Sequence, residues 1–345
     1  MSNHRFPFII SRKELDIMGL KELKEELNND VHSIISNEFD VEVTETRIVP
    51  TLDSQGITYP NLDTQTIKAK QIKTCVLYID MRKSTELNLK HKPKTVTKLY
   101  AAFMRAMVKA AQYYGGKVRN IIGDRVMIVF DEENCHTDAI QTAILLNSVG
   151  LYIINKHFTH NDISFGIGVD YGRMLVSKGG IRKNGEDNAP YKSLVWLGRP
   201  ANVASKLTDL ANKEIEIKNK VKSEFILANE GVGMPRTRKS ISDFMKNDLL
   251  NYSGWESFEA ASSQPAFYCQ KPSMKFYYIE EEIIETITTL KTPSILITET
   301  VYLAYKKANP NHSSIKENHW KEQDSNLYYE QSIYGSSLIY SSIQN

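Results

Sequence analysis

The sequence predicts an α/β protein, an α+β sandwich in which helices flank a mostly antiparallel sheet. Apolar, β-rich runs alternate with helical patterns along residues 72–210, and Gly123-Asp124 closes a hairpin between two of these runs. A hairpin joins neighbouring strands directly and makes them antiparallel. Each helical pattern carries one apolar face, so we expect the helices to cover the sheet.

The first elements follow from local patterns. Residues 74–80, TCVLYID, form a continuously apolar, β-rich run that predicts a buried strand ending in Asp80. Apolar positions recur at helical spacing over residues 95–114, and the glycines at 115–116 stop that helix. A second helix is expected over about residues 137–156.

The later elements continue this alternation. The run ISFGIGVDYGRMLVSKGG, residues 163–180, predicts two strands that break at Tyr171-Gly172. A third helix is expected to begin near Pro200. Residues 293–308 predict a strand followed by a helix, and residues 332–343 predict a terminal strand that rejoins the sheet.

The chain divides into segments of different character. Residues 1–70 predict an N-terminal extension, because helical spacing over residues 11–39 is followed by a linker-like stretch rich in Pro, Asp and Thr. Residues 71–345 then form the main domain. Within it, the less regular stretch at about residues 212–292 predicts an insertion.

The composition argues against several classes of protein. The chain of 345 residues has a formal net charge of +2, so no basic field recommends nucleic acid or a membrane as a partner. Cys75, Cys135 and Cys269 lack the paired spacing of a metal site, and their odd number favours a reducing compartment. No run of about 18 apolar residues and no signal-peptide pattern occurs. We therefore expect a soluble, cytoplasmic protein.

Two carboxylates carry the candidate chemistry. Asp80 and Asp124 each lie where a strand opens into a turn, and adjacent strands of one sheet would bring them side by side. Two such carboxylates repel unless a cation joins them, and hard divalent ions such as Mg²⁺ prefer oxygen ligands. Lys83, Ser84 and Thr85 follow the first strand and are candidates to present backbone N–H groups to phosphate. The alternative is that Gly-Asp serves only a tight turn.

Three stretches carry a family resemblance. These are LYIDMRKSTEL (77–87), VRNIIGDRVMIVF (118–130) and WLGRPANVASKL (196–207). In order and separation they resemble the signature stretches of class III nucleotide cyclases. The resemblance implies the cyclase fold, two divalent cations (Mn²⁺ or Mg²⁺) and a site formed between two cyclase domains. Because the chain holds one such domain with both halves of the site, it implies a homodimer with composite sites.

The resemblance also implies roles for individual residues. Asp80 and Asp124 match the two metal-binding aspartates, and the backbone carbonyl of Met81 matches a further metal ligand. Asn202 matches the asparagine that orients the ribose. Lys206 stands where the family has an arginine that stabilises the transition state, so the positive charge is kept while the bidentate fork is lost.

Two of these assignments have a plainer alternative. The stretch NVASKL also reads as a helix with a polar first turn. Lys321 lies where the family often has a phosphate-binding lysine, and the alternative, which the sequence favours, is a plain exposed lysine.

The base pocket departs from the purine pattern. Asn120 replaces the usual lysine or glutamate, and Val195 offers no hydrogen bond at the second base position, so a purine edge would stay partly unpaired. Tyr78, on the same strand face as Asp80, reduces the room for a two-ring base. This pattern is similar to the bacterial Pycsar pyrimidine cyclases. The resemblance implies UTP or CTP as substrate, a second messenger in anti-phage defence, and a downstream effector activated by the cyclic nucleotide.

Three other functions remain open from the sequence. The chain could be an adenylate or guanylate cyclase that has diverged at two pocket positions. It could also be a catalytically silent, nucleotide-binding regulatory domain. In a metal-dependent phosphatase or nuclease, the third alternative, the NVASK stretch would have no role and the near-neutral charge would give a nucleic acid little to grip.

Overall fold

The protein divides into two compact units. The computed structural model describes residues 17–159, 163–229, 237–250, 255–259, 265–269, 275–324 and 330–344. The first unit comprises the chain up to residue 213 together with residues 292–345, and the second comprises Glu214–Lys291.

The first unit contains a nine-stranded sheet and its helices. Its strands are β1 (Asp40–Thr46), β2 (Thr66–Met81), β3 (Lys117–Ile122), β4 (Arg125–Val129), β5 (Phe165–Lys183), β6 (Glu186–Leu197), β12 (Ile295–Thr298), β13 (Lys321–Glu322) and β14 (Ile333–Ser336). Its helices are α1 (Ile17–Ile35), α2 (Ser84–Lys90), α3 (Pro93–Tyr113), α4 (Cys135–Val149), a π-helical turn (Gly150–Ile154), α5 (Asn155–His157), α6 (Arg199–Leu210), α8 (Glu299–Ala308), α9 (Ser313–Lys316) and α10 (Ser341–Gln344).

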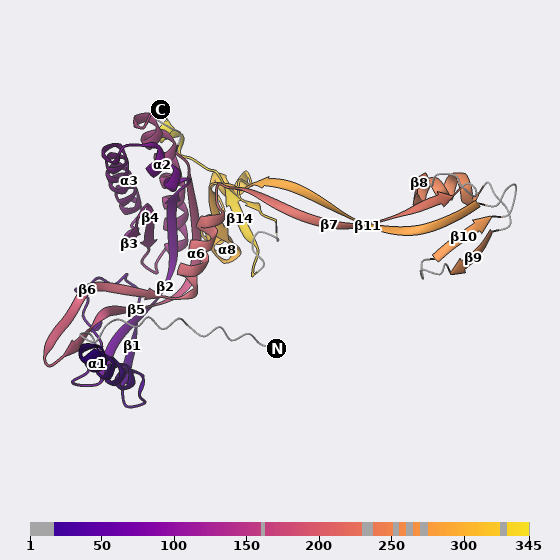
Figure 1. The fold of residues 1–345 in the computed structure, drawn as a ribbon. Coiled ribbons are helices and arrows are strands. Elements are labelled where there is room, and N and C mark those ends of the chain that lie inside the picture. The colour runs from indigo at the N-terminus through magenta and orange to yellow at the C-terminus, as the bar shows by residue number, and fades with distance from the viewer. Residues whose placement is uncertain are drawn as a thin grey trace. The chain divides into compact units, whose positions relative to one another are not determined.

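The sheet is mixed and mostly antiparallel, which confirms the predicted class. Its strand order is β13-β14-β12-β5-β2-β4-β3, with β1 paired to β2 and β6 paired to β5. The pairs β12–β5 and β1–β2 are parallel, and the other pairs are antiparallel. The long central strands β2 and β5 therefore organise the unit (Figure 1).

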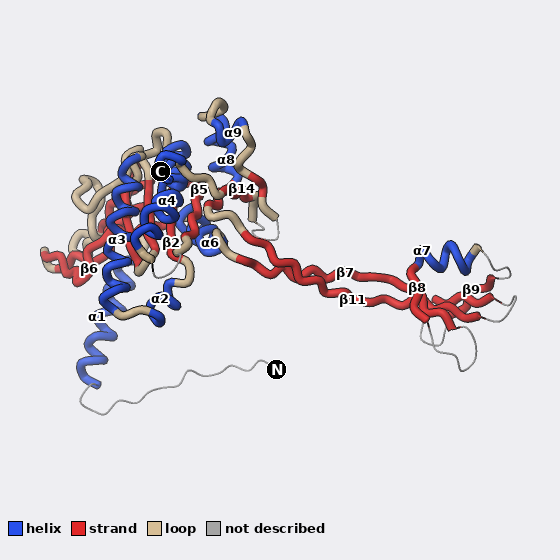
Figure 2. Tube along the Cα trace, turned by 90° about the horizontal axis from the view of Figure 1, so that it is seen from above, coloured by secondary structure: helices blue, strands red, loops and turns tan. Residues whose placement is uncertain are grey.

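Alternation along β2 divides the core between the two faces of the sheet. Leu77 and Ile79 pack into the cluster that contains Phe103 of α3 and Ile140 of α4. The intervening Val76 packs instead into the cluster formed with α6. Helices α3 and α4 thus cover one face and α6 covers the other, as the opposite placement of α3 and α6 about β2 shows in Figures 1 and 2.

The helices expected near residues 95–114 and near Pro200 are confirmed as α3 and α6. The helix expected over residues 137–156 is also present, because α4 continues through the π-helical turn and α5 to His157. One helical stretch among the described residues, Cys135–His157, is long and apolar enough to cross a membrane, but 67% of its apolar window is buried inside the protein. Such burial is typical of a core helix.

One local prediction is wrong and another is right over a shorter range. The run 163–180 does not break at Tyr171-Gly172, since β5 continues through both residues and pairs them with Cys75 and Thr74 of β2. The glycine serves packing, because a Cβ there would lie 2.8 Å from the Pro200 ring of α6. A terminal strand rejoins the sheet as predicted, since β14 pairs with β12, but it covers only Ile333–Ser336 of the expected residues 332–343.

The second unit is more regular than its sequence suggests. It contains β7 (Glu214–Asn229), β8 (Thr237–Ser240), α7 (Ile241–Asp243), a π-helical turn (Phe244–Leu249), β9 (Trp255–Glu259), β10 (Pro265–Cys269) and β11 (Lys275–Lys291). Strands β7 and β11 run antiparallel along their whole length, from the pair Glu214–Lys291 to the pair Asn229–Phe276 (Figure 2). A small core at one end includes the buried Phe244 and Tyr277.

Candidate active site

The two predicted carboxylates lie at the same end of neighbouring strands. The ladder between β2 and β4 last pairs Ile79 with Val126, so Asp80 and Arg125 follow directly at its open end. Asp124 lies one residue further, at the tip of the β3–β4 hairpin, where Gly123 has the positive φ of 61° that a tight turn requires. The strand register therefore brings Asp80 and Asp124 together.

Asp124 is held in a partly buried position beside a like charge. Burial, followed by the negative charge of Asp80, raises the pKa of the Asp124 carboxyl, and a hydrogen bond from Ser84 partly offsets this rise. Its Oδ2 atom is buried and has no hydrogen-bond partner among the described residues. A buried carboxylate oxygen without a partner is energetically costly, and a bound cation would relieve that cost.

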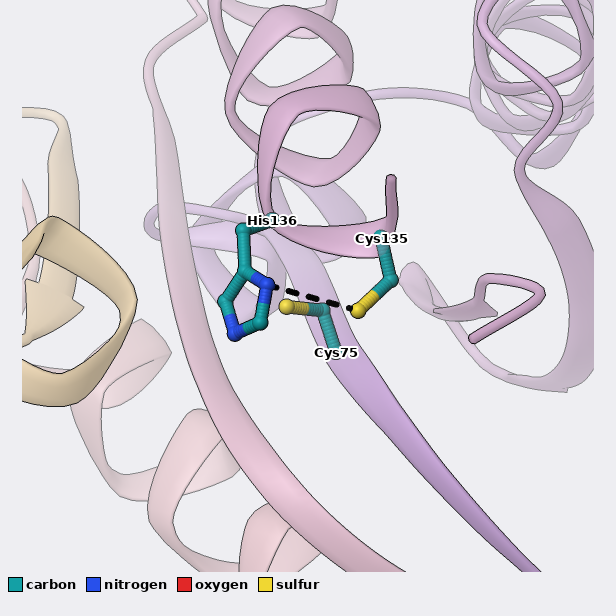
Figure 3. A group of neighbouring side chains, drawn as sticks. All are labelled: Cys75, Cys135 and His136. Carbon is teal, nitrogen blue, oxygen red and sulfur yellow. Dashed lines mark hydrogen bonds between the residues drawn. The ribbon is translucent and has the colours of Figure 1, made fainter. Parts of the chain in front are cut away.

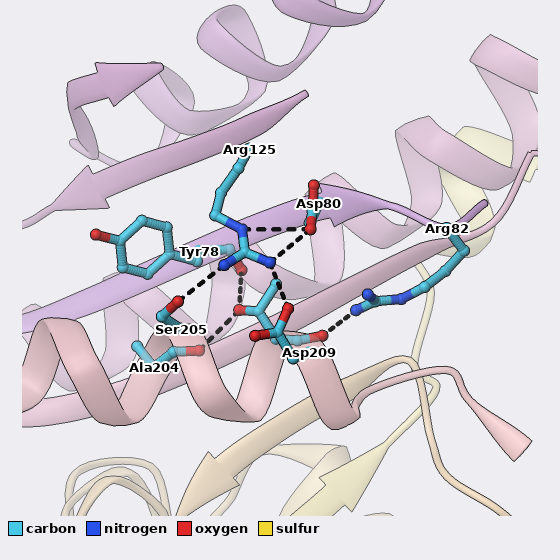
Figure 4. A network of polar contacts seen from close by, with 8 residues as sticks. Tyr78, Asp80, Arg82, Arg125, Ala204, Ser205 and Asp209 are labelled. Carbon is cyan, nitrogen blue, oxygen red and sulfur yellow. Dashed lines mark hydrogen bonds and ion pairs between the residues drawn. The ribbon is translucent and has the colours of Figure 1, made fainter. Parts of the chain in front are cut away.

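Arg125 neutralises the other carboxylate. Its Nη2 and Nε atoms donate to Asp80 Oδ2 over 2.6 and 3.2 Å, and its Nη1 donates to Ser205 Oγ over 2.9 Å. Nη2 also pairs with the carboxylate of Asp209. The guanidinium therefore ties the end of β2 to α6 through two carboxylates and a hydroxyl (Figure 4).

Helix α6 lies unusually close to the sheet at this point. A Cβ at Gly168 of β5 would lie 2.2 Å from the Ala204 carbonyl oxygen, so the glycine makes room for the helix backbone. The Thr208 hydroxyl donates to the carbonyls of Ala204 and Tyr78, at 2.8 and 3.2 Å. Arg82 donates to the Thr208 carbonyl. These contacts fix the position of the end of β2 under α6.

The site fits a hard divalent cation. It offers two carboxylates on adjoining backbone segments, one with an unpartnered buried oxygen. Hard cations such as Mg²⁺ and Mn²⁺ take oxygen ligands of this kind. The carbonyl of Met81, at the end of β2, could add a third oxygen.

Comparisons with known proteins agree with this geometry. Residues 67–234 match the family described as the adenylate and guanylate cyclase catalytic domain. A uridylate cyclase from Burkholderia cepacia is 33% identical over 176 residues, which cover 48% of this chain and 73% of that protein. A uridylate cyclase from Xanthomonas perforans is 31% identical over 194 residues, covering 54% and 77%. The chain belongs to the class III nucleotide cyclases. The family resemblance seen in the sequence is thereby confirmed.

A solved structure is also similar to the cyclase. The adenylyl cyclase CyaB from P. aeruginosa is 16% identical, with a TM-score of 0.38, over 63% of this chain and 97% of that one.

The predicted phosphate-binding residues follow the end of β2, a few residues after Asp80. Lys83 is exposed and has a left-handed backbone with φ 57°, directly before α2. Ser84 and Thr85 open that helix. The Ser84 side chain bonds to Asp124, so it contributes to the carboxylate site. Binding of phosphate by the three residues stays a prediction.

Asn202 and Lys206 lie one turn apart at exposed positions of α6. Lys206 Nζ lies 3.3 Å from the Glu330 carboxylate. Positions 205 and 209 of the same helix contact Arg125 instead. The assigned roles of Asn202 and Lys206 stay predictions.

Within one chain, the candidate base-binding residues do not all lie near the carboxylates. Tyr78 is half-buried on β2, and burial raises the pKa of its phenol, which keeps it neutral. Asn120 is exposed on β3, in the hairpin that holds Asp124. Val195 pairs with Ser177, eleven residues along β5 from the partner of Asp80, or about 35 Å of strand. Within one chain, Val195 therefore lies far along the sheet from the two carboxylates.

Lys321 is also remote from the carboxylates within one chain. It lies exposed on β13, and strands β14, β12 and β5 separate β13 from β2.

Sequence reasoning did not identify Arg125, Ser205 and Asp209 as site residues. Arg125 directly follows Asp124, so its charge beside the two predicted carboxylates was a usable signal. Ser205 and Asp209 are four residues apart and share one face of α6. Their partner on β4 is 80 or more residues away in the sequence, which no local pattern reveals.

Removing Arg125 tests its role as the counter-charge of Asp80. We expect Arg125→Ala to lower the stability of the metal-free cyclase by about 2 kcal/mol, because charge-assisted hydrogen bonds are lost. The variant should gain more stability from Mn²⁺ than the wild type, because the ion no longer competes with a guanidinium. Thermal unfolding across a Mn²⁺ titration measures both effects. Arg47→Ala, which removes an exposed ion pair with Glu132, is the control. Equal Mn²⁺ responses of Arg125→Ala and wild type would contradict the competition.

Neutralising Asp124 should stabilise the metal-free cyclase at pH 7. The folded-state pKa of Asp124 is raised, so stability falls as the pH rises through the interval between its ordinary and raised values. Asp124→Asn removes that cost, and its advantage should vanish at acidic pH, where the wild-type carboxyl is protonated too. Chemical unfolding in chelator across a pH series measures this difference.

Asp63 supplies the control, because its pKa is shifted in the opposite direction to that of Asp124. Backbone N–H groups of Gly185 and Asn184 lower the pKa of Asp63, so Asp63→Asn should not stabilise the protein. Lower stability of Asp124→Asn at pH 7 would show that its carboxylate is satisfied in the absence of metal.

Proposed function

We propose that the cyclase converts a pyrimidine nucleoside triphosphate, UTP ahead of CTP, to the 3′,5′-cyclic monophosphate and pyrophosphate. The observation that carries this proposal is the Asp80–Asp124 pair, in which Asp124 Oδ2 is buried without a partner in the described part of the chain. The order of UTP and CTP rests on the relatives named uridylate cyclase.

The proposed reaction needs little covalent chemistry from the protein. Two divalent cations, Mg²⁺ or Mn²⁺, bound by Asp80, Asp124 and the Met81 carbonyl would favour the 3′-oxyanion and neutralise the triphosphate. The 3′-hydroxyl releases its proton to water, its oxygen attacks the α-phosphorus, the bond from that phosphorus to the bridging oxygen breaks, and pyrophosphate leaves. In this proposal Asn202 orients the ribose, and Lys206 offsets the charge that develops on the phosphate.

The proposed preference for a pyrimidine rests on the size and polarity of three side chains. Tyr78 is bulky and half-buried on the strand face that carries Asp80, which favours a one-ring base. Asn120 offers both a donor and an acceptor, whereas Val195 offers neither. A purine edge opposite Val195 would lose a hydrogen bond on burial.

The proposed assembly is a homodimer with two composite sites. About 35 Å along β5 separates the level of Val195 from that of Asp80, which supports a site completed by a second copy. Asn202 and Lys206 lie at exposed positions of α6, where a second copy could contact them. A head-to-tail pair would bring the metal-binding half of each chain to the base-binding half of the other.

The cellular part of the proposal rests on the resemblance to Pycsar cyclases. It places the enzyme in the cytoplasm, where its product acts as a second messenger in antiviral defence through a cyclic-nucleotide-activated effector. The formal net charge of +2 supports a free nucleotide over nucleic acid or a membrane surface as partner.

Product analysis tests the substrate. The purified chain is incubated separately with ATP, GTP, CTP and UTP and with Mn²⁺ or Mg²⁺, and mass spectrometry identifies any cyclic monophosphate. We expect cyclic UMP as the main product and none from Asp80→Ala, whose fold is checked by circular dichroism. Asn120→Lys combined with Val195→Asp should shift the preference toward ATP. A purine product from the wild type would contradict the proposed pocket, and full turnover by Asp80→Ala would contradict the metal-binding role.

Complementation tests the composite site. Asp124→Ala and Asn202→Ala are each expected to be inactive, because every site in either homodimer lacks one half. When the two variants are co-expressed and their subunits allowed to exchange, half of the randomly formed dimers contain one copy of each variant. One of the two sites in such a dimer is intact, so activity should recover to about a quarter of the wild-type level. Asp80→Ala mixed with Asp124→Ala is the matched control and should stay inactive. No recovery in the first mixture, with mixed dimers shown by native mass spectrometry, would place both halves in one chain.

A further inference from the structure

A second cluster of ligand-type side chains lies on the opposite face of β2. Among the described residues, the donor atoms of Cys75, Cys135 and His136 all lie within 4.8 Å of one another. Cys75 is in the middle of β2, and the other two residues open α4 (Figure 3). Cys75 and Asp80 are five residues apart, so strand alternation directs their side chains to opposite faces. The cluster is therefore separate from the carboxylate site.

The spacing of the three donors fits a tetrahedral ion. Cys135 Sγ lies 3.7 Å from His136 Nδ1. Zinc bond lengths of about 2.3 Å to sulfur and about 2.1 Å to nitrogen give tetrahedral edges of about 3.6 Å between S and N. The edge between two sulfurs is about 3.8 Å on the same basis. Small side-chain movements would therefore bring all three donors onto one ion.

The donor atoms of the cluster favour a soft cation. Two of them are sulfur atoms of fully buried cysteines, and the third is an imidazole nitrogen. Two sulfurs and an imidazole suit zinc or another thiophilic ion and not the hard ions suited to Asp80 and Asp124.

We propose that Cys75, Cys135 and His136 form a three-ligand site for a thiophilic divalent cation, with Zn²⁺ as the first candidate. Both cysteines bind as thiolates, so binding releases their thiol protons to water, and a water or small anion occupies the fourth position. The ion joins the centre of β2 to the first turn of α4. It thereby clamps the strand that ends in Asp80 to the core helix.

The surroundings of His136 limit the expected affinity. Its ring packs against the Tyr171 ring, with centroids 4.2 Å apart, which restrains its orientation. Its Nε2 atom is buried and has no hydrogen-bond partner in the described part of the chain. Ligation through Nδ1 places the ring proton on this nitrogen. Without an acceptor there, we expect affinity about 10- to 100-fold below that of a fully supported zinc site.

Cobalt substitution tests the site without relying on activity. The full chain is reduced, stripped of metal and titrated with Co²⁺, whose thiolate complexes give a charge-transfer absorption that carboxylate ligation lacks. We expect one equivalent to develop this band and one equivalent of Zn²⁺ to remove it. Cys135→Ala and Cys75→Ala should lose the band. Cys269→Ala, at the third cysteine, and Asp80→Ala, at the carboxylate site, should keep it.

His136 is only half-buried, so a variant at this residue disturbs the fully buried core less than a cysteine variant does. His136→Gln removes the imidazole and should weaken Co²⁺ binding at least tenfold while circular dichroism stays unchanged. The proposal is overturned if the reduced wild type shows no thiolate band. It is also overturned if the band survives in both Cys75→Ala and Cys135→Ala, or if His136→Gln binds Co²⁺ with wild-type affinity.

Discussion

The charge balance at the end of β2 is the constraint on which the candidate active site depends. Asp80 and Asp124 meet because the register of β2 and β4 places the end of β2 beside the β3–β4 hairpin. Arg125 neutralises Asp80 and reaches Asp209 on α6, while Asp124 keeps one buried oxygen without a partner among the described residues. Partly buried carboxylates need such compensation, because desolvation makes an unpaired charge costly. The same guanidinium thus holds helix, strand and hairpin in place, and a metal ion would have to share or replace it.

The two faces of β2 carry different coordination chemistry. Asp80 lies toward the face covered by α6, where carboxylate and hydroxyl oxygens lie close together. Cys75 lies toward the face covered by α3 and α4, where two sulfurs and an imidazole meet. Period-two alternation is sufficient to separate these environments within five residues. Hard and soft cations would therefore bind along one strand without competing for ligands.

The geometry of a single chain bears directly on catalysis. The carboxylates lie at one end of the β2–β5 ladder, and Val195 pairs near the other end of β5. Residues 165–176 of β5 are paired with β2 along this stretch, which keeps the two ends of the ladder apart. In the proposed homodimer, activity would depend on protein concentration and on any partner that changes dimer formation. The exposed positions of Asn202 and Lys206 are consistent with that requirement.

The sequence by itself determined the features that local periodicity encodes. These are the buried strand at residues 74–80, the helix at 95–114, the hairpin at Gly123-Asp124 and the three stretches that identify the family. Only the tertiary structure decided the continuity of β5, the pairing of Arg125 with α6 and the meeting of Cys75 with Cys135. The partners in each case are 60 or more residues apart. Such contacts depend on sheet register and on how closely a helix approaches a strand, and neither leaves a periodic trace in the sequence around one partner.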